Sequence, residues 1–192
     1  MRSSEFPFIS VMFAVIMGMG VVYILMAIAA IIRWGHQQIT PYWLHLSWII
    51  FMLLLHFHVW WGLWDLQSVE SWHYFSYLYL LSGPVLLFVA VSIIIPDIQQ
   101  SEKIDLRQFY FDHSTRFFLT LTLAVIWGLL LYPVFFGQAD PVLEWLLLFL
   151  VIIIMLMFIK KPIWHGTLSV LAWILFFVWV LSYGFSLSNG LK

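Results

Sequence analysis

Histidines inside an apolar stretch are the residues of this sequence best suited to chemistry. His45, His56 and His58 are the only ionisable side chains in the run 43–64, and His56 and His58 lie near its middle. Ionisable groups at such a depth in a membrane helix are costly, so they normally face other helices or a water-filled cavity. Because an imidazole changes charge in the physiological pH range, these residues suit proton relay or pH-dependent gating.

Helical spacing divides these side chains between two faces of the segment. At about 100° per residue, His56 shares a face with His45, whereas His58 shares the opposite face with Ser47 and Asp65. The next apolar run adds hydroxyl groups that an imidazole could bond. We predict a pore or polar intramembrane site made of His56, His58, Asp65, Ser47, Tyr77 and Ser82.

This site favours a membrane channel or carrier for protons, cations or a small solute. Acidic residues expected on the outer rim would raise the local concentration of cations. An imidazole in a helix bundle can also simply bond a neighbouring carbonyl or hydroxyl group, which is the structural alternative for both midplane histidines. A non-catalytic scaffold or assembly subunit is a further alternative, and no catalytic residue is predicted.

A membrane redox subunit is the remaining alternative. His45 and His165 are both expected near the cytoplasmic face, on different helices, where two imidazoles could bind haem b or a transition metal. The main hypothesis, a channel or carrier, needs no cofactor.

The composition places the helices that carry these residues in a membrane. The 192 residues are 64% hydrophobic and only 9% charged, whereas about a quarter of an ordinary soluble domain is charged. That excludes a soluble domain, and a net charge of −1 excludes a nucleic-acid binder. Without cysteine the chain has no disulfide framework and no thiolate metal site.

Six predominantly apolar runs are long enough to cross a bilayer, which takes about 20 residues. We therefore predict an all-α integral membrane protein, with residues 1–192 forming a single compact bundle of six transmembrane helices. Pro41, the pair Asp140–Pro141 and the run Lys160–Pro162 mark helix boundaries. The predicted spans are residues 6–32, 43–64, 73–95, 117–136, 142–159 and 163–185.

Lys and Arg predict the orientation. Six crossings place six of the eight Lys and Arg residues on one side, which the positive-inside rule assigns to the cytoplasm, and both termini outside. Residues 97–115 are then a cytoplasmic connection, predicted to hold a short helix in the membrane interface. Asp112, His113 and Arg116 are predicted to lie at the cytoplasmic mouth.

Three stretches resemble a family of uncharacterised multi-pass bacterial inner-membrane proteins. They are PYWLHL at residues 41–46, WWGLW at 60–64 and DLRQFYFDH at 105–113, so the similarity covers about the first two thirds of the chain. The resemblance implies a bacterial inner-membrane location and no particular activity. Besides the lipid bilayer, the expected partners are further copies of the chain or other subunits of a membrane complex, because short loops leave few other contact surfaces.

Overall fold

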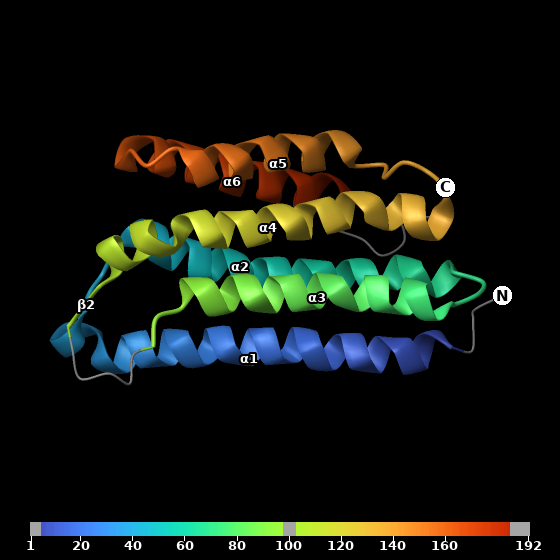
Figure 1. Ribbon diagram of the computed structural model, residues 1–192, viewed down its shortest axis with the longest axis horizontal. Helices are drawn as coiled ribbons and strands as arrows, with labels where there is room; N and C mark the ends of the chain where they lie inside the picture. The colour runs from blue at the N-terminus through green and yellow to red at the C-terminus, as the bar shows by residue number, and fades with distance from the viewer. Residues whose placement is uncertain (1–4, 98–102, 185–192) are drawn as a thin grey trace.

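A computed structural model describes residues 5–97 and 103–184 of the chain. The described residues form an all-α bundle of six helices lying along one long axis (Figure 1), which confirms the prediction of an all-α bundle with six helices. A 3₁₀ helix, η1 (Leu63–Ser68), extends α2, and a π-helix, η2 (Val180–Gly184), extends α6. The helices are α1 (Phe6–Gln38), α2 (Trp43–Gly62), α3 (Tyr74–Ile94), α4 (Leu106–Phe136), α5 (Leu143–Phe158) and α6 (Pro162–Trp179).

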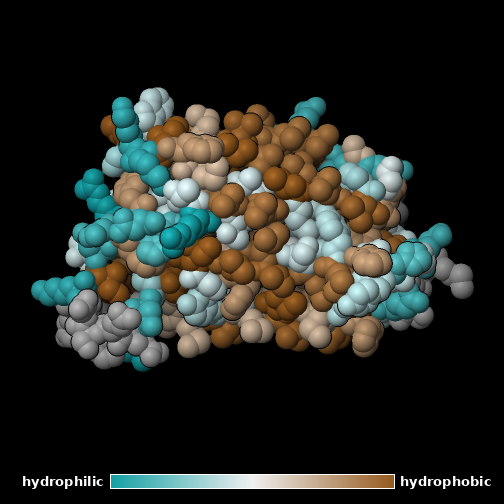
Figure 2. Space-filling model, viewed as in Figure 1, coloured by the Kyte–Doolittle hydropathy of each residue, from teal (hydrophilic) through white to brown (hydrophobic). Residues whose placement is uncertain are grey.

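The helices have the lengths and hydropathy of membrane spans. Within the described ranges, five are long and apolar enough to cross a bilayer, whereas α5 has only 16 residues and rises about 24 Å. Hydrophobic side chains cover the middle of the molecule, and hydrophilic ones gather toward its two ends (Figure 2). The chain is therefore a multi-pass membrane protein.

The two ends of the bundle carry opposite charge. We call one the basic end, because every Lys and Arg in the described ranges lies in the half of the bundle toward it: Arg33, Lys103, Arg107, Arg116, Lys160 and Lys161. The other is the acidic end, where α1, α3 and α5 begin and α2 and α4 finish. Its acidic residues are Glu5, Asp65, Glu70, Asp140 and Glu144. Arg2 and Lys192, which the sequence groups with this end, lie outside the described residues.

One pair of helices, the α5–α6 hairpin, lies at the side of the bundle and contacts few of the other helices (Figure 1). α3 packs against both α1 and α4, and α4 packs in turn against α5. Figure 1 shows α1 on one side of the bundle and the α5–α6 hairpin on the opposite side. The hairpin therefore joins the other helices mainly through α4, with a smaller contact between α6 and α2.

The predicted interfacial helix is not a separate element. α4 begins at Leu106 and continues without a break through the span to Phe136, so this prediction is wrong for residues 106–115. The Asp105 side chain caps the helix by accepting from the backbone N–H groups of Arg107 and Gln108, at 2.8 and 3.3 Å. Leu106 and Tyr110 are buried in the bundle, so this segment packs on protein. Residues 98–102 of the predicted connection lie outside the described part.

A two-residue strand pair holds the basic end together. β1 (Ile39–Thr40), between α1 and α2, pairs in parallel with β2 (Ile104–Asp105), which precedes α4. Ile39 faces Ile104 and Thr40 faces Asp105. The pairing satisfies backbone N–H and C=O groups that a loop near the membrane would otherwise leave without partners. Because β2 directly precedes α4, the pair also ties the start of α4 to the connection between α1 and α2.

Candidate functional site

A cavity of about 390 Å³ opens in the acidic half of the bundle, between α2, α4 and the α5–α6 hairpin. Its size is at the lower end of the range of about 300–1,000 Å³ that is usual for small-molecule sites. Most of its wall is apolar or aromatic. The aromatic lining residues are Phe13, Trp61, Trp127, Tyr132, Trp145, Phe149, Phe176 and Trp179.

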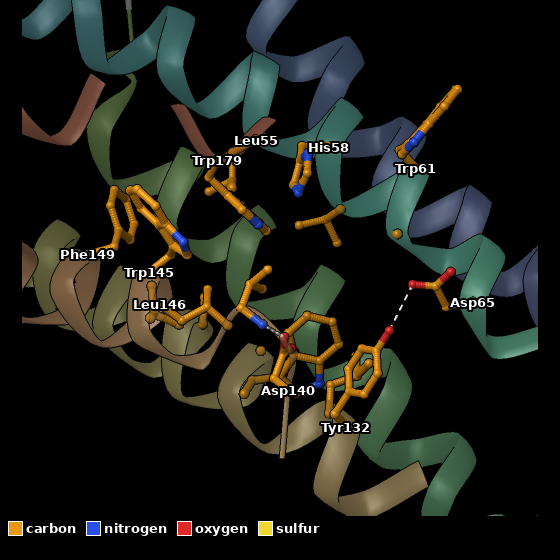
Figure 3. A pocket seen from close by; sticks show the side chains of 18 of the residues that line it. Leu55, His58, Trp61, Asp65, Tyr132, Asp140, Trp145, Leu146, Phe149 and Trp179 are labelled. Atoms are coloured by element: carbon orange, nitrogen blue, oxygen red, sulfur yellow. Dashed lines mark hydrogen bonds between the residues drawn. The ribbon is translucent and has the colours of Figure 1, made fainter. Parts of the chain in front are cut away.

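Two carboxylates and a phenol line the cavity where α2 and α4 finish. The Tyr132 hydroxyl donates to Asp65 Oδ2 at 3.1 Å, which connects α4 to η1 (Figure 3). Asp140 Oδ1 accepts from the backbone N–H of Val142 at 2.8 Å, a bond that orders the turn leading into α5. Three polar side chains, from η1, α4 and the connection between α4 and α5, thus line the cavity.

Burial changes the titration of one of these carboxyls. The pKa of Asp140 is raised above its ordinary value, chiefly because the partly buried site disfavours the charged form. The hydrogen bond from Val142 lowers the pKa, and the negative charge of Asp65 raises it further. The negative charge of Asp65 thus adds to the effect of burial in disfavouring the ionised form of Asp140.

His58 lies deeper in the same cavity, about 10 Å along the helix from Asp65. Its ring packs edge-on against Trp179, with centroids 4.1 Å apart, and against Phe176 at 5.8 Å. Figure 3 shows the imidazole directed into the space between α2 and Trp179. His58 is the deepest ionisable group among the described residues of the cavity wall.

Aromatic packing closes the cavity toward the basic end. Phe51 stacks on Phe149, with centroids 5.7 Å apart and planes 12° apart, and packs edge-on against Trp173 at 5.1 Å. Trp48 lies beside Phe51 at 4.9 Å and donates its indole N–H to Ser169 Oγ at 3.0 Å. We call Trp48, Phe51, Phe117, Phe118 and Trp173 the aromatic floor. The first four of these side chains are fully buried.

No protein-family model, curated protein or solved structure matches this chain. The resemblance to bacterial inner-membrane proteins therefore stays a prediction, and the cavity is the feature from which a function can be inferred.

The structure brings His58 and Asp65 to the cavity and leaves His56 outside it. His56 is buried between α1 and α2, with Nδ1 bonded to the carbonyl of Met52 at 2.7 Å. Its Nε2 has no hydrogen-bond partner in the described part of the chain and faces Gly20 of α1. The two midplane histidines thus lie in separate environments, on opposite faces of α2 as their spacing indicated.

The hydroxyl residues predicted for the site do not line the cavity either. Ser47 and Ser82 each bond a carbonyl of their own helix, Leu44 at 2.8 Å and Tyr79 at 2.6 Å respectively. Tyr77 is half-buried and packs against the hydrophobic core. Such local bonds satisfy a hydroxyl group inside a membrane helix without creating a polar site.

The histidines of the haem or metal alternative already bond protein groups. His45 Nε2 bonds the carbonyl of Ile94 at 2.7 Å. His165 bonds the Tyr110 hydroxyl at 2.9 Å through Nδ1 and the Ile159 carbonyl through Nε2. Both rings contact the ring of Tyr110, with centroids 6.5 and 5.5 Å away. Both ring nitrogens of His165 are bonded, so metal binding there would cost it one of these bonds, whereas His45 Nδ1 has no hydrogen-bond partner among the described residues. The alternative stays a prediction.

The residues predicted at the cytoplasmic mouth lie in the first three turns of α4. Asp112 and Arg116 are exposed, and His113 is half-buried. His113 bonds the carbonyl of Phe109 at 2.9 Å and stacks on the Phe109 ring with centroids 4.1 Å apart. Nearby, Lys160 Nζ donates to the hydroxyls of Ser114 and Thr115, at 2.8 and 2.6 Å.

Sequence reasoning missed Tyr132, Trp145 and Trp179 as cavity residues. Asp140 was expected only as a helix cap and as part of an acidic rim. Tyr132 and Trp179 lie within apolar runs whose neighbours in space depend on the order of helices around the bundle. The one available signal was that Asp140 and Asp65 lie at helix ends on the same side of the membrane.

Proposed function

We propose that the protein is a membrane carrier for a small amphipathic solute, which binds in the cavity between α2, α4 and the α5–α6 hairpin. The observation that carries this proposal is the one-sided shape of the cavity. It has polar groups near the acidic end, aromatic walls along its length and an aromatic floor toward the basic end.

A carrier accounts for this shape better than a channel does. A channel needs a continuous polar path, whereas the layer below the cavity is made of packed rings without ionisable groups. A carrier binds its solute from one side and opens to the other by moving one group of helices against another. The α5–α6 hairpin suits that movement because α4 provides most of its contacts with the other helices.

Filling the cavity tests the proposal. Gly128 of α4 lines the cavity, and a Cβ placed there has no other side chain within 4 Å, so Gly128→Leu fills space without a backbone clash. Gly18→Leu is the matched control, since Gly18 also has open space but is an exposed position of α1 away from the cavity. Both changes add the same side chain to a helix.

The measurement is uptake of a small-molecule mixture into proteoliposomes, read by mass spectrometry against protein-free liposomes. We expect selective accumulation of particular solutes with the wild type and with Gly18→Leu, and its loss with Gly128→Leu. Identical uptake profiles for Gly128→Leu and the wild type would overturn the proposal, as would a wild-type profile equal to that of empty liposomes.

A further inference from the structure

We propose that the solute is an organic cation, with its positive group at Asp65 and Asp140 and its apolar part against the aromatic walls. This inference rests on the proposed function and specifies the class of ligand. The site is the cavity itself, and the carboxylates determine the sign of charge that it accepts.

The cavity wall carries uncompensated negative charge. Asp65 and Asp140 both line it, and no Lys or Arg does so among residues 5–97 and 103–184. Tyr132 bonds Oδ2 of Asp65, and Oδ1 accepts no hydrogen bond from the residues that the structure describes. Asp140 is partly buried and Asp65 is exposed. A carboxylate at a partly buried site is stabilised by an opposite charge nearby, so a bound cation would favour the ionised form of Asp140.

Aromatic rings also favour a cation over an anion along the length of the cavity. Tyr132 lines its wall beside Asp65, Trp145 lines it beside Phe149 (Figure 3), and Trp179 lies against His58. The faces of these rings attract cations, most strongly organic ammonium groups that carry little water. An anion would meet both the carboxylates and the negative faces of the rings.

The ligand chemistry favours an organic cation over a metal ion. In the part of the chain that the structure describes, no group of three or more His, Asp, Glu or Cys side chains could hold a metal. The apolar wall from Leu55 to Phe149 would also leave most of a metal ion's coordination positions empty. The same wall suits the hydrocarbon part of an amphipathic amine, and the path of about 10 Å from Asp65 to His58 is long enough for one or two rings.

The test uses two probes of the same shape and opposite charge, tetraphenylphosphonium and tetraphenylborate. Binding of each to the purified full-length protein is measured by equilibrium dialysis and corrected for protein-free micelles. The variant Asp65→Asn/Asp140→Asn removes both charges while keeping oxygen acceptors for Tyr132 and Val142. Glu70→Gln is the control, because Glu70 is an exposed acidic residue of the same end that does not line the cavity.

We expect the wild type and Glu70→Gln to prefer the phosphonium probe, and the double variant to lose about tenfold in its affinity for that probe. Equal affinities of the wild type for both probes, or unchanged phosphonium binding in the double variant, would overturn the inference. Gly128→Leu separates the two proposals. If Gly128→Leu abolishes binding of both probes while Asp65→Asn/Asp140→Asn binds the phosphonium probe like the wild type, the cavity binds solutes but does not select them by charge. If Gly128→Leu changes the binding of neither probe, the proposed function fails as well.

Discussion

Gly20 of α1 provides the space that the imidazole of His56 on α2 occupies. A Cβ placed on Gly20 would overlap the His56 ring, so the two helices approach as closely as they do because this position has no side chain. Small residues at helix contacts serve the same purpose in many membrane proteins. The His56 ring thus packs between α1 and α2 and does not reach the cavity, and its Nε2 has no hydrogen-bond partner within residues 5–97 and 103–184.

Replacing Gly20 should therefore weaken the contact between α1 and α2. We expect Gly20→Ala to lower the free energy of unfolding by about 1–3 kcal/mol, because an extra methyl group in a packed site forces side chains or helices apart. The measurement is unfolding in a mild detergent titrated with a denaturing one. Gly18→Ala is the control, since no side chain lies within 4 Å of that position. Equal stability of the two variants would contradict the prediction.

A reciprocal pair of bonds joins α3 to α4. Trp127 Nε1 donates to the Tyr79 carbonyl at 2.9 Å, and the Tyr79 hydroxyl donates to the Trp127 carbonyl at 2.6 Å. Tyr79→Phe removes the second bond and should cost about 0.5–2 kcal/mol in the same unfolding assay. Tyr74→Phe, at a position 69% exposed, should leave stability unchanged. A loss of the same size in both variants would show that the bond is unimportant.

Phe51 is the centre of the aromatic floor, and its removal should open the cavity toward the basic end. We expect Phe51→Ala to let protons and small cations leak across proteoliposomes in which the wild type is tight, and to reduce stability by about 3–5 kcal/mol. Phe51→Leu fills part of the space and should leak much less. A tight Phe51→Ala protein that is still folded would show that the floor does not separate the two ends.

The raised pKa of Asp140 predicts a pH dependence of stability. A carboxyl whose pKa is higher in the folded than in the unfolded chain contributes stability that is complete below the unfolded pKa, about 3.9. That contribution is lost as pH rises through the folded pKa, because the ionised form is disfavoured by burial and by Asp65. Asn at this position keeps the acceptor for Val142 and cannot ionise.

The Asp140→Asn variant should therefore gain thermal stability relative to the wild type as pH rises from about 4 to about 7. The measurement is the difference between the two unfolding midpoints at each pH. Glu70→Gln, at an exposed position, should show a much smaller change. A difference between wild type and Asp140→Asn that stays constant with pH would contradict the assignment of this titration to Asp140.

Sequence reasoning located the helices because long apolar runs and proline boundaries are local properties. The predicted first span, 6–32, lies within α1, and the predicted third, 73–95, differs from α3 by one residue at each end. The prediction for residues 106–115 was wrong because an amphipathic pattern is the same whether its apolar face meets lipid or protein. Here Leu106 and Tyr110 face the bundle.

The candidate site was only partly predictable for a different reason. Helical spacing relates His58 to Asp65 within one segment, and both do line the cavity. It contains no information about Tyr132 of α4 or Trp179 of α6, because their contacts with α2 depend on the order of the helices in space. Nor does spacing show that His56 packs against Gly20 of another helix and does not line the cavity.

The 16 residues of α5 give the protein an uneven hydrophobic height around its circumference. The apolar part of α4 beside it, residues 117–136, rises about 30 Å, whereas α5 rises about 24 Å against a hydrocarbon layer of about 30 Å. A span shorter than the hydrocarbon layer is accommodated by local thinning of the bilayer, by flanking side chains that reach the interface or by oligomerisation. Because the α5–α6 hairpin forms one wall of the cavity, a mismatch between α5 and the hydrocarbon layer concerns the element that the proposed carrier would have to move.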